Sequence, residues 1–145
     1  MTVTAPPVDS RVIGLAHYAA RAVLERVLSR HGATFQEQVT LRSVLVADQP
    51  LTREGLVALV VASLKADRAE VHATVDQLLA KGLVSADGGT VRATDAGRAL
   101  HETVNAESGA VSARVYAGIP AGDRAVAGRV LALVTERANA ELAAM

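Results

Sequence analysis

The chain has 145 residues, half of them hydrophobic, so it is long enough for one domain with a sizeable core. The absence of cysteine excludes disulfides, thiolate zinc sites, cysteine nucleophiles and thiol redox sensing. The 15 basic and 15 acidic residues cancel, and this balance argues against strong nonspecific binding to nucleic acid.

The chain is expected to open with a loose segment followed by two helices. Residues 1–9 contain two prolines and are predicted to form a disordered arm. Apolar residues at helical spacing then predict a helix over 10–31, which Gly32 ends. Thr34 and Glu37 form a capping-box pair, which places the start of a second helix.

Two more helices follow across a short turn. Thr52 is suited to cap a third helix that ends near Leu64. Asp67 and Glu70 make another capping box, which opens a fourth helix that Gly82 closes. Two consecutive helices joined by a short turn are typical of a helix-turn-helix.

A hairpin signal separates these helices from the last two. Residues 83–86 and 90–93 read as short extended segments that flank 87–89 (D-G-G), where glycine tolerates the positive φ of a tight turn. A fifth helix is expected over 95–116, and Pro120 suits the first turn of a sixth helix that runs to the C-terminus. The fold class predicted is therefore mainly α with a small β-hairpin wing, a winged helix-turn-helix.

Two short motifs resemble the MarR (multiple antibiotic resistance regulator) family. Residues 75–84 (V-D-Q-L-L-A-K-G-L-V) resemble the V-D-R-L-x-x-K-G-L-V end of that family's recognition helix. Residues 93–98 (A-T-D-A-G-R) resemble the leucine-threonine-x-x-glycine segment after its wing. Together with the helix order, the resemblance covers 10–145.

The resemblance implies a domain organisation and a function. It implies one MarR-like domain with a winged-helix DNA-binding region over 34–98 and dimerisation helices over 10–31 and 95–145. It further implies a homodimer that binds double-stranded DNA at inverted repeats, with a small-molecule effector between the two regions. The chain also departs from the family: the wing tip at 87–90 carries no basic residue, and Ala73 and Gln77 stand where many members have arginine.

The fourth helix and its surroundings supply the candidate DNA contacts. Val71, Val75 and Leu78 share one face and should point into the core, which leaves the opposite face for DNA. Base-edge contacts are expected from Arg68, His72 and Gln77, and phosphate contacts from Thr52, Arg53, Lys65 and Arg92. The alternative is a solvated face with internal ion pairs, because residues 52–98 hold six basic and six acidic side chains.

A second cluster lies on the first helix. Spacings of three and four residues bring His17, Tyr18 and Arg21 within reach of one another. Together with Phe35 and Tyr116 they are candidates to line a pocket for a small aromatic anionic ligand, with Arg21 binding the carboxylate. The alternative interpretation is ordinary packing at a dimer interface.

Other classes of protein find no support in the sequence. His17 and His31 lie fourteen residues apart, too far for one metal on one helix, and no nucleophile elbow or glycine-rich phosphate loop occurs. We therefore expect no enzyme, cofactor or metal site. No membrane-length apolar run or signal peptide is recognised, which predicts a cytoplasmic protein. The rival to a DNA-binding regulator is a dimeric winged-helix module for protein interaction or effector binding, with little DNA affinity.

Overall fold

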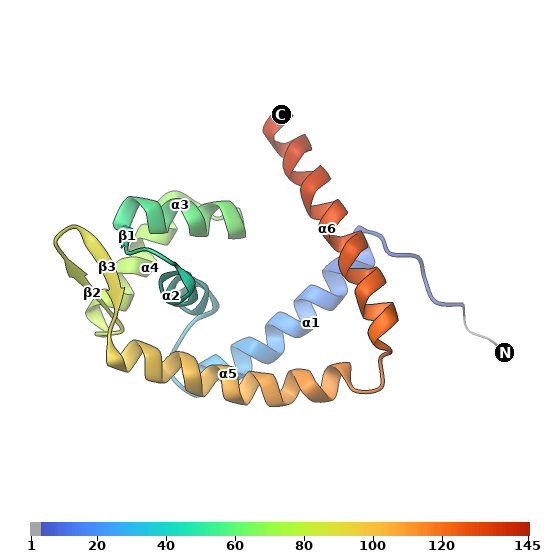
Figure 1. Cartoon of the computed structure of the whole chain (residues 1–145), viewed down its shortest axis with the longest axis horizontal. Coiled ribbons are helices and arrows are strands. Elements are labelled where there is room, and N and C mark those ends of the chain that lie inside the picture. The colour runs from blue at the N-terminus through green and yellow to red at the C-terminus, as the bar shows by residue number, and fades with distance from the viewer. Residues whose placement is uncertain (1–3) are drawn as a thin grey trace. The chain divides into compact units, whose positions relative to one another are not determined.

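The computed structural model describes residues 4–145, and residues 1–3 of the expected arm lie outside the described residues. Residues 4–9 are exposed and belong to no helix or strand. The elements are α1 (Ser10–Ser29), α2 (Phe35–Val46), β1 (Leu51–Thr52), α3 (Arg53–Leu64), α4 (Arg68–Ala80), β2 (Val84–Asp87), β3 (Thr90–Ala93), α5 (Asp95–Tyr116) and α6 (Ala121–Ala144) (Figure 1). They divide into two compact units, one ending at Val111 and the other covering Ser112–Met145. The predicted fold class is confirmed.

The helix starts are set by short-range side-chain caps. Thr34, Thr52 and Asp67 each accept a hydrogen bond from a backbone N–H three residues on, which confirms three predicted caps. The capping box at Thr34 is only half formed, because the carboxylate of Glu37 is held by Lys81 instead of turning back to the helix start. None of the helices in residues 4–145 combines the length and apolarity needed to cross a membrane.

The core of the first unit lies between three helices and a small sheet. Figure 1 shows α2, α3 and α4 gathered beside the β2–β3 hairpin. The core residues are aliphatic and buried: Leu41, Leu56, Val57, Val60, Val71, Val75, Leu78, Val84 and Val91. Because the three α4 residues among them lie at helical spacing, one face of α4 is fixed inward and the other is left outside.

The sheet has one strand more than the sequence predicted. Its order is β1-β3-β2, all antiparallel, with Leu51 opposite Val91 and Asp87 opposite Thr90. Gly88 and Gly89 have φ values of 56° and 85°, which is the positive-φ turn expected of a two-residue hairpin. Strand β1 has only two residues, so no alternation of apolar and polar residues could reveal it.

The first unit also holds α1 against α5. Val27 and Leu28, near the end of α1, form a buried cluster with Val104 of α5, and Phe35 at the start of α2 packs against it. Gly97 lies where α5 meets the hairpin, and a Cβ there would sit 2.1 Å from the carbonyl oxygen of Leu83. This close approach fixes where α5 begins relative to the wing.

The second unit consists of the end of α5 and the whole of α6. Gly118 has a φ of 77° in the turn between them, and Arg124 lies over the ring of Tyr116, 4.5 Å from its centroid. Not one residue of α6 is buried. Its exposed large apolar residues are Val126, Val130, Leu131, Leu133, Val134 and Leu142.

Candidate nucleic-acid interface and the adjoining pocket

The outer face of α4 is built from small and polar residues. Val71, Val75 and Leu78 are fully buried, as the sequence predicted. The exposed positions of this helix include Ala69, Ala73, Asp76, Gln77 and Ala80. A backbone can approach such a surface closely, and Gln77 is the residue on it suited to pair with a base edge.

Arg53 ties the start of α3 to α4. Its Nε donates to Nδ1 of His72 at 3.1 Å, and its Nη2 donates to the His72 carbonyl oxygen at 3.1 Å and to Oδ1 of Asp76 at 2.7 Å. Since the ring nitrogen Nδ1 accepts, the neutral imidazole carries its proton on Nε2. Arg53 therefore holds the His72 ring in one orientation. The fold thus brings together two residues that were predicted to contact DNA.

A second ion pair joins the same two helices. Arg68, at the start of α4, pairs with Glu54, and Oε1 of Glu54 lies 3.5 Å from Nε2 of His72. Both partners of the Arg68–Glu54 pair are more than half exposed. Arg53 and Arg68, two of the three arginines predicted to meet DNA, are thus each paired with a carboxylate on the same surface.

The remaining predicted DNA contacts lie around this surface. The Thr52 hydroxyl caps α3 by accepting from the Gly55 N–H at 3.0 Å. Lys65 adopts the left-handed conformation after α3 with φ at 54°, and its Nζ donates to the Ala62 carbonyl oxygen. Arg92 is exposed on β3. The ion pairs of residues 4–145 include neither Lys65 nor Arg92, so these two cations face no competing carboxylate.

Lys81 forms a contact that sequence reasoning missed. Its Nζ donates to both carboxylate oxygens of Glu37, at 2.9 and 2.8 Å, and to the carbonyl oxygen of Gly32 at 2.8 Å. Glu37 is only 3% exposed, whereas Lys81 is 40% exposed. This bridge attaches the end of α4 to the start of α2. Glu37 is the one acidic residue of α2, and its place in the first turn was the available signal.

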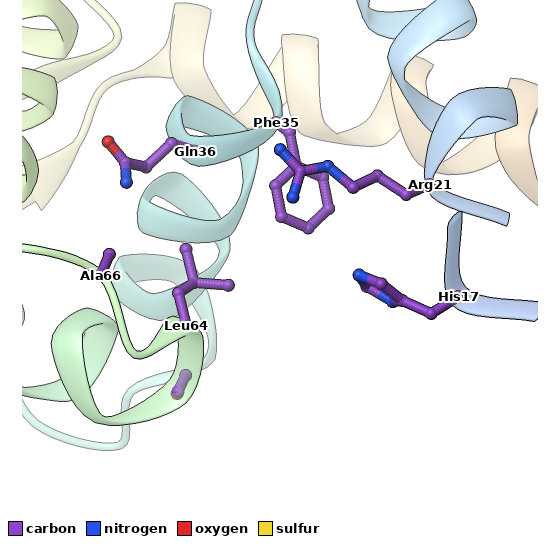
Figure 2. A pocket seen from close by; sticks show the side chains of 7 residues that line it. His17, Arg21, Phe35, Gln36, Leu64 and Ala66 are labelled. Atoms are coloured by element: carbon purple, nitrogen blue, oxygen red, sulfur yellow. The ribbon is translucent and has the colours of Figure 1, made fainter. Parts of the chain in front are cut away.

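A cavity of about 280 Å³ lies beside the start of α2. Figure 2 shows its lining, which is His17, Arg21, Phe35, Gln36, Ser63, Leu64 and Ala66. The guanidinium carbon of Arg21 lies 4.1 Å from the centroid of the Phe35 ring, a cation–π contact. Nε of Arg21 also donates to Oε1 of Glu25 at 3.0 Å, and both side chains of this pair are close to half exposed.

The structure brings three of the five predicted pocket residues together. His17, Arg21 and Phe35 line the cavity, but Tyr18 and Tyr116 do not. Tyr18 is 68% exposed, and its ring meets that of His17 edge-on at 5.9 Å. Tyr116 belongs to the second unit.

Four lining residues were missed by the sequence. Ser63 and Leu64 end α3, Ala66 lies in the turn between α3 and α4, and Gln36 comes from α2. The Gln36 Oε1 atom accepts a hydrogen bond from the hydroxyl of Thr74 on α4. No local pattern signals this contact, because its partners lie 38 residues apart.

Comparison with known proteins shows which of them share this fold. No protein-family model and no curated protein matches the sequence. Solved structures do match. The reduced form of MarR from E. coli is 22% identical, with a TM-score of 0.70 over 90% of this chain and 95% of that chain.

Two ligand-bound structures are similar as well. CouR from Rhodococcus jostii RHA1 bound to p-coumaroyl-CoA is 22% identical, with a TM-score of 0.67 over 84% of this chain and 86% of that chain. A MarR family protein from Mycobacterium tuberculosis in complex with p-aminosalicylic acid is 22% identical, with a TM-score of 0.68 over 90% and 99%. The chain therefore has the winged-helix fold of the MarR-family regulators.

Proposed function

We propose that the chain is a DNA-binding transcriptional regulator that acts on an inverted-repeat operator as a homodimer. The observation that carries the proposal is the division of α4 into a buried aliphatic face and an exposed face of small and polar residues. Such a helix, beside a hairpin wing, is the element that enters the major groove in winged-helix proteins. The fold likeness to MarR-family structures supports the same function.

Base contacts and phosphate contacts fall to different residues. Gln77 and His72 would meet base edges, and glutamine is suited to pair with adenine. Lys65 and Arg92, which form no ion pair within residues 4–145, would meet phosphates together with Thr52. Arg53 and Arg68 would join them by exchanging Asp76 and Glu54 for phosphate oxygens, at the energetic cost of breaking exposed ion pairs.

Dimerisation is supported by apolar surface that the chain leaves uncovered. Val126, Val130 and Val134 follow one another at four-residue spacing on α6, and all three are at least 38% exposed. In α1, Leu15 is also exposed, at 57%. An exposed apolar row such as that of α6 marks an interface, and a second copy of the chain is the partner that a two-fold operator requires.

The alternative function is that of a dimeric module with little affinity for DNA. The ion pairs of Arg53 with Asp76 and of Arg68 with Glu54 favour it, because two carboxylates lie on the proposed DNA face and repel phosphate. A neutral chain adds no general attraction to DNA. A dimeric module that binds a protein or a small molecule would keep the same fold.

Selection from a random pool of DNA duplexes separates the two functions. A regulator should enrich one two-fold symmetric sequence and bind it more tightly than the unselected pool at every salt concentration. Gln77→Ala should weaken that preference and leave the salt dependence unchanged. Arg92→Ala should weaken binding to all sequences and lower the salt slope by about 1.8, because each protomer of the dimer loses one phosphate contact worth about 0.9. No enrichment at low salt would support the rival.

We propose further that the cavity beside α2 binds a small aromatic anion. Arg21 supplies the charge and the Phe35 ring supplies an aromatic wall. Salicylate should raise the melting temperature of the wild type, since a ligand that binds only the folded state stabilises it. Arg21→Ala should abolish the shift, and the matched control Tyr18→Ala should keep it, because Tyr18 lies outside the cavity. An equal shift in both variants would remove Arg21 from the site.

A further inference from the structure

One wall of the cavity is the turn of the helix-turn-helix itself. Leu64 and Ala66 line the cavity on either side of Lys65, and α4 begins two residues later at Arg68. Figure 2 shows Leu64 and Ala66 on one side and Arg21 with His17 on the other, with the ring of Phe35 between them. An occupant of the cavity therefore touches the segment that positions the start of α4.

Gln36 connects the same cavity to the middle of α4. Its Oε1 atom accepts from the hydroxyl of Thr74, a side chain that is only 4% exposed. The same hydroxyl oxygen lies 3.1 Å from the backbone carbonyl oxygen of Glu70, one turn back along α4. A hydroxyl has a single proton to donate, so the two oxygens compete for it.

This competition makes the contact easy to exchange. If the Gln36 amide turns away, the Thr74 hydroxyl still has an acceptor in the Glu70 carbonyl, so no buried donor is left unsatisfied. Of the two polar atoms in the Gln36 side-chain amide, only the oxygen forms a hydrogen bond within residues 4–145. Its nitrogen keeps two N–H donors for a carboxylate in the cavity.

Glu37, the residue after Gln36, provides a second contact between α2 and the end of α4. Glu37 is buried and holds Lys81 at the end of α4. The first turn of α2 therefore contacts α4 at two points, the middle through Thr74 and the end through Lys81. A small change at this turn is passed on to α4 because buried, paired groups do not deform independently.

We propose that Gln36 couples the cavity to the outer face of α4. With the cavity empty, its amide oxygen holds the Thr74 hydroxyl. With an aromatic carboxylate bound, the amide turns to donate to the ligand, and the Thr74 hydroxyl donates to the Glu70 carbonyl instead. This removes one of the two contacts between the first turn of α2 and α4 and loosens α4 at its middle. The inference rests on the proposed effector site and assigns the route by which that site reaches the DNA face.

Thr74→Val tests the coupling, and Thr40→Val is its matched control. Both threonines are buried and both donate to the backbone carbonyl four residues back, which for Thr40 is that of Gln36, but only Thr74 also donates to the side-chain amide of Gln36. The first measurement is salicylate binding by calorimetry. The second is hydrogen exchange of the α4 amides with and without salicylate, which needs no DNA.

We expect wild type and Thr40→Val to bind salicylate and to exchange their α4 amides several-fold faster when it is bound. Thr74→Val should bind salicylate within about threefold of the wild-type affinity but lose most of this response, since the contact with the Gln36 side chain is already absent in this variant. A full response in Thr74→Val would overturn the coupling and leave the effector site intact. Absence of salicylate binding by the wild type would overturn the effector site, and the coupling with it.

Discussion

The two units of the chain differ in how many of their apolar residues are buried. In the first unit, α2, α3, α4 and the hairpin enclose nine buried aliphatic residues. In the second unit, α6 runs for 24 residues and buries none. The first unit has partners for its apolar faces within the chain, and α6 has apolar faces that a second copy could cover.

This contrast predicts that stability should divide into two kinds. The folding of the first unit, the winged-helix body, should not depend on protein concentration, because its core is formed within one chain. The order of α6 should depend on concentration, because its apolar surface requires association. The following substitutions test that division, from the largest expected effect to the smallest.

Leu78→Ala should have the largest effect on the body. Leu78 is fully buried on α4, and truncation of a buried leucine costs about 2–5 kcal/mol of unfolding free energy. The measurement is urea unfolding at two protein concentrations. The matched variant Leu133→Ala, at a residue that is 48% exposed on α6, should lower stability only in a concentration-dependent way. Equal, concentration-independent losses would remove the distinction between the units.

Val130→Asp should act on association and spare the body. Burial of an unpaired carboxylate in an apolar interface costs several kcal/mol, which corresponds to at least about 100-fold weaker dimerisation. Analytical ultracentrifugation measures the dimer constant directly. Ala132→Asp places the same charge on the opposite side of α6 and is the control. A wild type that sediments as a monomer at micromolar concentration would refute the dimer itself.

Lys81→Met should destabilise the body by leaving the Glu37 carboxylate buried without its partner. Breaking a fully buried pair from one side costs about 3–5 kcal/mol. We expect a smaller loss here, since Lys81 is 40% exposed and water can reach the pair. Chemical unfolding measures it. The double variant with Glu37→Gln should recover much of the loss, and a double variant as unstable as the single one would show that the charge of Glu37 is not the cause.

The sequence predicted those features that depend on neighbouring residues. The caps at Thr52 and Asp67 and the glycine turn at 88–89 involve residues within three positions of each other, so a short stretch of sequence contains all the information. The buried face of α4 was predictable for the same reason, because one period of apolar residues specifies it.

The contacts that shape the candidate sites join distant residues, and the sequence could not reveal them. Arg53 and Asp76 lie 23 positions apart, Gln36 and Thr74 lie 38 apart, and Lys81 and Glu37 lie 44 apart. Each depends on how two helices pack. The resemblance to the family's recognition helix located α4, but only the packing showed that Arg53 and Arg68 are already paired with acids.

Ala73→Arg should have the smallest effect on stability and a separate effect on DNA. Ala73 is exposed on the outer face of α4, so the larger side chain should change the unfolding free energy by no more than about 0.5 kcal/mol. An arginine that reaches guanine with two hydrogen bonds contributes about 1–3 kcal/mol of discrimination. We therefore expect tighter binding to a selected duplex, measured by fluorescence anisotropy at several salt concentrations.

The same substitution also tests how the acids on this face act. Asp76 lies one turn from position 73 and accepts a hydrogen bond from Arg53, so a new arginine would compete for its carboxylate. If Asp76 captures the new side chain, Ala73→Arg alone will gain little affinity and the further change Asp76→Asn will restore the gain. Tighter binding that is equal for selected and random duplexes would indicate phosphate attraction alone. Unfolding of the variant would instead show that the outer face of α4 is covered in the native assembly, which would exclude it as the surface that meets DNA.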